Sequence, residues 1–398
     1  MPDVGIVMPV YKQIPIYLYQ AIKSIRRQSY RRFHLVIVVD GVTKSVLRTI
    51  RKAKGKDRRI KVISRRQNQG VAKALNIGFR YLYARADIQY LTWVSSDNIY
   101  YKNYIRIFRN TLAKSPAHIG LVYSGFRHIN GKGKPLFNKD HQREMLNWQN
   151  QPKENILDVC FVGASFMYRK SVAMKTGFYR LEPIEDYDYW LRLTEHCEIQ
   201  FIPKLLMDYR VNSKHSISAQ LQTKEQHRRW RLSYQLAKFE ARGRRKIPLE
   251  TTVIYPVNIA SEHTIQMIES LYEQSYSNYK LIVIDISPSQ AVTPMVHAVP
   301  DPRLEVIGMP NASVKHAIHE GARRAQTPFS FVYGQHAYPP HTLQNMINHL
   351  RQFPPHVISA TTITNGNAIQ ARVTHPVNNP QFGELYRTGK LLTILGRK

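Results

Sequence analysis

The chain has 398 residues, 43% of them hydrophobic, which excludes an intrinsically disordered chain and is enough for two or three domains with cores of their own. Its 58 lysines and arginines against 27 aspartates and glutamates give a net charge of +31. This charge favours polyanionic partners, whether nucleic acid, anionic lipid, acidic glycan or nucleotide diphosphate. Two cysteines, Cys160 and Cys197, are too few for a disulfide framework, so we expect a reducing compartment.

The N-terminus runs directly into a strand-like segment, without the basic and apolar regions of a secretory signal. No apolar run is long enough to span a bilayer. We therefore expect a cytoplasmic protein, either free or in peripheral contact with the inner surface of the membrane.

Strands and helices alternate along the first hundred residues. β-Branched runs, helical spacing of apolar residues and turn signals such as Asp40-Gly41 mark the boundaries. The predicted strands are 4–10, 33–39, 60–63 and 90–94, and the predicted helices are 16–28, 45–53 and 70–84. Such alternation predicts a mostly parallel sheet with helices on both faces.

Two acidic sites in the sequence suggest a ligand-binding or catalytic role. Asp97 follows the predicted strand 90–94, and Glu185, Asp186 and Asp188 lie within four positions of a run rich in aromatic residues and leucines. Carboxylates near apolar surface require a metal, a cation or a reacting proton, although acids at a helix start also complement the helix dipole. Because ligands bind where parallel strands end, the pair predicts a metal or diphosphate site facing a general base.

The order of strands and helices returns after Pro248. Residues 252–257, 273–284, 301–307 and 311–321 echo 6–10, 27–38, 57–63 and 68–78. Four matches in one order predict an internal duplication. We therefore expect a first domain at 1–219, a basic helical linker at 220–248 and a half domain at 249–398. The arginine-rich linker is either a solvated helix or a polyanion-binding segment.

The second copy differs from the first where chemistry is expected. Gln335 stands opposite Asp97, Ser287-Pro288 stands where Asp40-Gly41 turns, and no second acidic segment follows. We interpret it as a folded, catalytically silent copy whose basic surface, with the linker, holds an anionic acceptor. A different site formed by Gln335 and His336 is the alternative.

An ordered set of short motifs over residues 4–218 resembles the inverting family 2 glycosyltransferases of the GT-A nucleotide-diphospho-sugar fold. The motifs are Met8–Lys12, Gln28–Tyr30, Asp40-Gly41, Asn68–Asn76, Ser95–Asn98, Gly163–Arg169, Glu185–Arg192 and Tyr209–Val211. The resemblance implies an α/β fold, a Rossmann-like GT-A domain, here followed by a truncated, degenerate repeat of the same fold.

The resemblance also implies an activity, transfer of a sugar from a nucleotide-diphosphate donor to a hydroxyl of a glycan or glycan precursor, with inversion. It assigns the general base to Asp186, with Glu185 and Asp188 orienting the base or the acceptor. A divalent cation, Mn²⁺ or Mg²⁺, would neutralise the diphosphate. The implied contacts of the nucleotide sugar are Pro9, Tyr11, Asp40, Asn68, Lys73, Ser96, Asp97 and Arg210, and those of the metal are Asp97, Asn98 and His215.

Three departures from the family pattern stand out. A serine, Ser95 or Ser96, replaces the first acid of the metal motif, the acidic doublet is reduced to Asp40, and Asn212 stands where a histidine is common, with His215 slightly later. The default donor is a UDP-sugar and the acceptor a glycan or a lipid-linked, anionic molecule, and we do not expect nucleic acid as a partner. The alternative function is a non-catalytic polyanion- or glycan-binding protein on a glycosyltransferase scaffold, and a nucleotidyltransferase is a more distant third.

Overall fold

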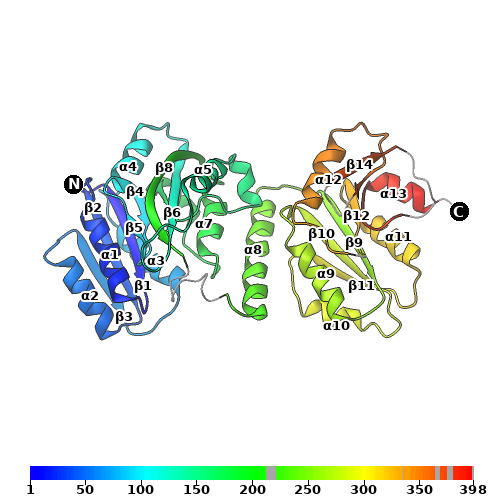
Figure 1. Ribbon diagram of the computed structural model, residues 1–398, viewed down its shortest axis with the longest axis horizontal. Coiled ribbons are helices and arrows are strands. Elements are labelled where there is room, and N and C mark those ends of the chain that lie inside the picture. Colours follow the sequence, from blue (N-terminus) through cyan, green and yellow to red (C-terminus); the bar gives the residue numbers. More distant parts are fainter. Residues whose placement is uncertain (212–220, 335, 364–367, 374–379, 397–398) are drawn as a thin grey trace. The chain divides into compact units, whose positions relative to one another are not determined.

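The computed structural model describes residues 1–211, 221–334, 336–363, 368–373 and 380–396 (Figure 1). The chain forms two compact units, Met1–Ala237 and Lys238–Lys398, and each contains one sheet. Among the described residues, no helix combines the length and apolar character needed to cross a membrane.

The sheet of the first unit has eight strands in the order β3-β2-β1-β4-β7-β6-β8-β5. Strands β3, β2, β1 and β4 are parallel, whereas β7 pairs antiparallel with both β4 and β6. The elements are β1 (Val4–Val10), α1 (Pro15–Arg26), β2 (Phe33–Asp40), α2 (Lys44–Lys54), β3 (Ile60–Arg65), α3 (Val71–Tyr83), β4 (Tyr90–Trp93), β5 (Ile99–Tyr100), α4 (Tyr104–Lys114), β6 (Ile119–Ile129), α5 (Lys139–Trp148), a 3₁₀ turn (Lys153–Leu157), β7 (Phe166–Arg169), α6 (Lys170–Thr176), α7 (Glu185–Leu193), β8 (Glu198–Arg210) and α8 (Lys224–Arg244).

Helices cover both faces of the parallel strands, which explains why β1 and β2 read as nearly continuous apolar runs. Side chains of α1, α2 and α4 pack against one face, where Ile6 and Met8 of β1 point. Helix α3 packs against the other face, where Val7 meets Gly78. The carboxyl ends of β1, β2 and β4 therefore lie together at one uncovered edge, where ligands bind in such sheets.

The second unit contains a seven-stranded sheet in the order β11-β10-β9-β12-β15-β13-β14. Its first five strands match β3-β2-β1-β4-β7 in order and direction. The elements are β9 (Thr251–Val257), α9 (Glu262–Tyr272), β10 (Tyr279–Asp285), α10 (Val292–His297), β11 (Leu304–Gly308), α11 (Val314–Arg324), β12 (Phe329–Val332), α12 (Thr342–Arg351), β13 (Ser359–Ile363), β14 (Ala368–Arg372), β15 (Glu384–Arg387) and α13 (Thr388–Leu395).

A glutamine performs the same structural task in both units. The side chain of Gln28 donates to the carbonyl of Tyr101 (2.7 Å) and accepts from the backbone N–H of Ile105 (3.0 Å) in α4. Gln274 donates to the carbonyl of Pro339 (2.9 Å) and accepts from the N–H of Leu343 (3.2 Å) in α12. The repeated Gln-Ser-Tyr motif thus fixes the first turn of a distant helix by satisfying its exposed N–H groups.

Two arginines also repeat their contacts. Arg59 forms a two-pronged pair with Asp57 and covers the ring of Phe33 at 4.3 Å, and Arg303 does the same with Asp301 and Tyr279 at 4.2 Å.

Arg169 of β7 donates to the carbonyls of Leu112 and Ser115, which end α4. Arg387 of β15 donates likewise to Leu350 and Phe353 at the end of α12. The α/β fold class with a second copy of the sheet is confirmed.

The strand register corrects two details of the expected repeat. Val10 of β1 pairs with Val39, and Val257 of β9 pairs with Asp285. Asp285 therefore corresponds to Val39, and the expectation that Ser287-Pro288 matches Asp40-Gly41 was shifted by one residue. Asp285 is buried and accepts hydrogen bonds from the backbone N–H groups of Ser287 and Thr293, which fasten the loop after β10.

The expectation that Gln335 stands opposite Asp97 was also shifted by one residue. Val7 pairs with Trp93 and Ile254 pairs with Val332, so the place of Asp97 is taken by His336. Gln335 itself lies outside the described residues.

A close approach between helix and strand depends on glycine in each unit. A Cβ at Gly78 would lie 2.5 Å from Cγ1 of Val7, and one at Gly321 would lie 2.6 Å from Cγ2 of Ile254. We expect Gly78→Ala and Gly321→Ala each to lower the free energy of unfolding of their unit by about 1–3 kcal/mol through overpacking, measured by urea titration. Gly243→Ala in α8 is the control, since nothing lies within 4 Å of its Cβ and alanine favours a helix. Equal stabilities of Gly78→Ala and the native chain would contradict this packing.

Candidate active site

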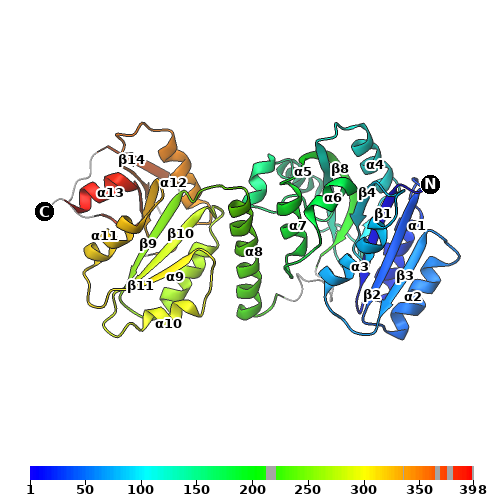
Figure 2. The same ribbon diagram turned by 180° about the vertical axis from the view of Figure 1, so that it is seen from behind.

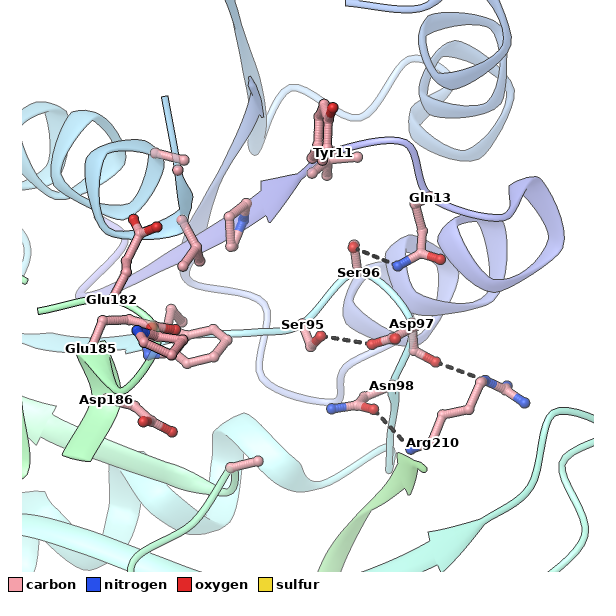
Figure 3. A pocket seen from close by; sticks show the side chains of 18 of the residues that line it. Tyr11, Gln13, Ser95, Ser96, Asp97, Asn98, Glu182, Glu185, Asp186 and Arg210 are labelled. Carbon is pink, nitrogen blue, oxygen red and sulfur yellow. Dashed lines mark hydrogen bonds between the residues drawn. The ribbon is translucent and has the colours of Figure 1, made fainter. Parts of the chain in front are cut away.

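A cavity of about 810 Å³ opens at the carboxyl edge of the first sheet. It lies between the ends of β1, β2 and β4, the start of α7 and the end of β8. Figure 3 shows that residues from these distant segments face one space. The volume is in the range of pockets that enclose small organic ligands.

One side of the cavity combines an aromatic ring with a buried acid. Asp40 ends β2, is 2% exposed and accepts a hydrogen bond from the backbone N–H of Gln69 through Oδ2 (2.9 Å). Its Oδ1 lies 3.7 Å from Arg65 but accepts no hydrogen bond. Tyr11 lies beside Asn68, and the neighbouring Lys12 lowers the pKa of the Tyr11 hydroxyl. An aromatic ring next to a carboxylate that can accept hydrogen bonds suits contact with a nucleobase and its ribose.

The loop after β4 brings a carboxylate into the cavity. Asp97 is 5% exposed and accepts from the hydroxyl of Ser95 (2.6 Å). Ser96 accepts from the side-chain amide of Gln13 (3.1 Å), which ties this loop to the end of β1. The Asn98 side-chain oxygen accepts from the backbone N–H of Arg210 (3.0 Å), so that oxygen serves the β8 backbone.

Arg210 holds the same loop in place from the other side. Its guanidinium donates to the carbonyls of Asp97 (3.1 Å), Asn130 (3.0 Å) and Gly131 (2.9 Å) and lies 4.0 Å from the ring of Tyr17. The residue is 3% exposed. Arg210 thus lines the cavity while its donors are used within the protein, which makes it a clamp on the Asp97 loop.

Two acids at the start of α7 face the cavity. Glu185 is 4% exposed, and its Oε2 has no hydrogen-bond partner. Burial, joined by the negative charge of Asp186, raises the pKa of Glu185 to about 8. Burial also raises the pKa of Asp186, whose Oδ1 accepts from the N–H of Tyr187 (2.7 Å). In Figure 3 the Asp186 carboxylate is turned toward the side of the cavity that carries Asp97 and Asn98.

The third acid of this run has a different environment. Asp188 is 1% exposed and forms ion pairs with Arg180 (3.1 Å) and Arg192 (2.8 Å). It does not line the cavity. Helical geometry explains the difference, because two residues along a helix turn a side chain to the other face.

Most residues singled out from the sequence meet in this cavity. The lining includes Pro9, Tyr11, Asp40, Asn68, Ser96, Asp97, Asn98, Glu185, Asp186 and Arg210. Lys73 is exposed on α3 and does not line the cavity. His215 lies outside the described residues.

The sequence analysis missed several polar residues of the lining, among them Gln13, His128 and Glu182. Glu182 accepts from the N–H of Ala72 (2.8 Å), so its carboxylate caps α3 at the cavity wall. Gln226 and Arg229 reach the cavity from α8. The available signal was the pair Trp230 and Tyr234, aromatic residues one turn apart in a charged helix, which mark a packed face.

Aromatic stacking fixes the first half of α8 against α7. The rings of Tyr187 and Tyr234 stack at 4.6 Å, and those of Trp230 and Tyr234 at 4.9 Å. This stack lies next to Arg229 in sequence, so it positions an exposed cation at the cavity.

The cavity offers oxygen atoms of the kind that divalent cations bind. Within the described part of the chain, no three His, Cys, Asp or Glu side chains group closely enough to hold a metal by themselves. Mg²⁺ and Mn²⁺ bind in many sites through one or two carboxylates together with substrate phosphates and water. Asp97, with the hydroxyls of Ser95 and Ser96 beside it, fits a shared site of that kind.

Part of the chain is similar in sequence to known proteins. Residues 5–177 match the family model described as glycosyl transferase family 2. The matched segment lies within the first unit. An uncharacterized glycosyltransferase of Rickettsia felis is 28% identical over 216 residues, 54% of this chain and 35% of that protein. The uncharacterized glycosyltransferase RP339 of Rickettsia prowazekii is 26% identical over 232 residues, 57% of this chain and 69% of that protein.

The chain thus spans about a third of the length of the first relative and about two thirds of the second. Among solved structures, S. aureus TarS in complex with UDP-GlcNAc is similar with a TM-score of 0.48 and 14% identity, over 75% of this chain and 82% of that one.

The buried carboxyl of Glu185 predicts a pH-dependent stability. Because the pKa of Glu185 is raised from 4.5 to about 8, the folded chain binds a proton there that the unfolded chain has released. Stability due to this group is therefore present below about pH 4.5 and falls as the pH rises to about 8. Glu185→Gln should remove this loss, so its advantage over the native chain should be at least about 1 kcal/mol larger at pH 8.5 than at pH 4.5.

Urea titrations of both proteins at the two pH values measure this difference. Glu154→Gln, which changes an exposed glutamate, is the matched control. A pH dependence shared by the native chain and Glu185→Gln would show that Glu185 does not gain a proton on folding.

Proposed function

We propose that the first unit transfers a sugar from a nucleotide-diphosphate donor to a hydroxyl of a glycan or glycan precursor, with inversion at the anomeric carbon. The observation that carries this proposal is one cavity that joins the Asp97 loop to Asp186. Inverting transfer requires a site for the leaving diphosphate and a base on the acceptor side. The match of residues 5–177 to the family model of glycosyl transferase family 2 supports the reaction class.

The nucleoside part of the donor is assigned to the end of β1 and β2. Tyr11 would lie against the base, and Asp40 would accept a hydrogen bond from the base or ribose through its Oδ1, which lacks a hydrogen-bond partner. Pro9, Asn68 and Ser96 complete this wall of the cavity. UDP remains the default nucleotide.

The diphosphate is assigned to the space between Asp97 and α8. Arg229 lines that space and is exposed, whereas the donors of Arg210 are used by backbone carbonyls. Of these two arginines, we therefore assign the contact with the diphosphate to Arg229. A divalent cation held by Asp97 with the diphosphate would neutralise charge on the leaving group.

Asp186 is assigned as the general base. It takes the proton of the acceptor hydroxyl while that oxygen bonds to the anomeric carbon, and the bond from this carbon to the donor phosphate oxygen breaks with its electron pair. The proton ends on Asp186 and the nucleoside diphosphate leaves. Because burial raises the pKa of Asp186, transfer should increase with pH as this carboxyl ionises.

Replacing the base tests this assignment directly. Asp186→Asn keeps the shape but accepts no proton, so we expect transfer to fall by about 10²–10⁴-fold while donor binding is retained. Sugar transfer across a panel of nucleotide sugars and acceptors measures the rate, and NMR of the product reports its anomeric configuration. Asp188→Asn should instead lower the free energy of unfolding by about 1–3 kcal/mol, because Arg180 and Arg192 lose their counter-charge. Full transfer activity in Asp186→Asn would remove it as the base.

Ligand-induced stabilisation tests the donor side. UDP at about 100 times its dissociation constant should stabilise the native state by about 2.7 kcal/mol, seen as a rise in melting temperature that Mn²⁺ increases. Asp97→Ala should abolish the part that depends on Mn²⁺, and Arg229→Ala should weaken the rest.

Lys73→Ala is the matched control for Arg229→Ala, since Lys73 is exposed but outside the cavity. If Lys73→Ala weakens UDP binding and Arg229→Ala does not, the phosphate contact belongs to Lys73. If UDP, GDP and dTDP all leave the melting curve unchanged with Mn²⁺ present, the donor site is rejected and the scaffold serves polyanion or glycan binding instead.

A further inference from the structure

The positive charge of the chain is concentrated in one part of the first unit. Residues 12–66 contain seventeen lysines and arginines but only two acidic residues, both aspartates. Residues 249–398 contain eleven lysines and arginines and nine acidic residues. The expectation of a basic second copy is therefore wrong. The charged segment folds into α1, α2 and β3, which group together in Figures 1 and 2.

An exposed set of cations on this segment forms what we call the basic face: Lys44, Arg48, Arg51 and Lys52 of α2 and Lys56 in the following turn. Lys61 on the edge strand β3 is also exposed but points to the other face of the sheet, since its neighbours Ile60 and Val62 pack on the side of α2. No carboxylate in the described part of the chain lies within 4.0 Å of any of these cations. The acids nearby are otherwise engaged, Asp57 with Arg26 and Arg59, and Asp40 beside Arg65.

The basic face disfavours folding of its own helix. Lys44, Arg48 and Lys52 follow one another at four-residue steps, where like charges repel. The first turn of α2 also contains Lys44 and no acid, against the preference of the helix dipole. Val46, Ile50 and Ala53 hold the helix to the core from the opposite side. A nearby anionic surface would relieve this repulsion. Lysine on an edge strand also prevents sheet association, which accounts for Lys61 but not for the stripe on α2.

Apolar side chains adjoin the basic face at the edge where the cavity opens. Ile16 at the start of α1 is 55% exposed, and Val42, two residues before Lys44, is 39% exposed. Both follow strands, β1 and β2, whose ends line the cavity. Apolar side chains next to cations suit the boundary between lipid headgroups and acyl chains. A nucleic-acid surface would offer phosphates but no apolar layer to meet them.

We infer that the basic face docks the first unit on an anionic lipid membrane, with Ile16 and Val42 at the headgroup level and the cavity opening at the docked edge. Attraction of each cation to anionic lipid is local and screened by salt. If the cavity transfers sugar as proposed above, docking would present it to a lipid-linked acceptor. Membrane binding itself does not depend on that activity.

Co-sedimentation with phosphatidylglycerol–phosphatidylcholine vesicles, without donor, tests the inference on the full chain. We expect binding at low salt that is lost in about 0.5 M NaCl, where charges are screened, and that is absent with vesicles of pure phosphatidylcholine. The triple variant Arg48→Gln, Arg51→Gln, Lys52→Gln should bind about 100-fold more weakly. The matched control Lys114→Gln, Lys175→Gln, Lys204→Gln removes the same charge from exposed positions on other elements and should bind within about fivefold of the native chain.

Three results would overturn the inference. The first is native protein that ignores phosphatidylglycerol vesicles at low salt. The second is an equal loss in both triple variants, which would make the binding a response to net charge alone. The third is binding to duplex DNA that depends on Arg48, Arg51 and Lys52 while vesicles are ignored. Circular dichroism of each variant checks the fold, and UDP-induced stabilisation, which these substitutions should leave unchanged, separates failure here from failure of the proposed function.

Discussion

Parallel pairing of β1 with β2 and β4 is the constraint on which the rest of the first unit depends. Because the three strands run in one direction, their carboxyl ends meet at one edge, and each delivers a different group there: Tyr11 after β1, Asp40 at the end of β2 and Asp97 after β4. The close approach of α3 through Gly78 covers one face and leaves this edge open. The common direction of the strands thus brings the polar residues of the cavity together, whereas side chains such as Arg210 hold the loops in position.

The sequence predicted this part of the site well because each signal was local. A β-branched run followed by an acid identifies both the strand and the residue at its end, as with Asp40 and Asp97. Contacts that depend on partners far away in the chain could not be predicted from local patterns. Arg210 looks like a phosphate ligand in sequence, but three carbonyls of other segments take its donors. Arg229 was read as part of a linker, since its place in the cavity arises from the stacking of Tyr234 on Tyr187, residues far apart in the chain.

The second unit separates motifs that build the fold from motifs that carry chemistry. Three residues of the second unit, Gln274, Arg303 and Arg387, repeat the contacts of Gln28, Arg59 and Arg169 in the first. These contacts either satisfy backbone groups at helix termini or hold the connection to a strand. They recur because the sheet requires them. Asp285, by contrast, stands one position before the place of Asp40 and is used to fasten its own loop. Resemblance over such scaffold motifs supports the fold, and only residues such as Asp97 and Asp186 support an activity.

Charge placement adds a different kind of argument, since it works against stability. Helix α2 is held to the core by its buried residues Val46, Ile50 and Ala53. On its exposed side, the positive charges of Lys44, Arg48 and Lys52 repel one another. The counterpart of α2 in the second unit is α10, which follows β10 as α2 follows β2. Helix α10 also has no acid in its first turn, but it contains no lysine or arginine, so the fold does not impose the stripe of cations on α2. An external anionic surface gives it a physical reason, and the exposed Ile16 and Val42 beside it point to lipid.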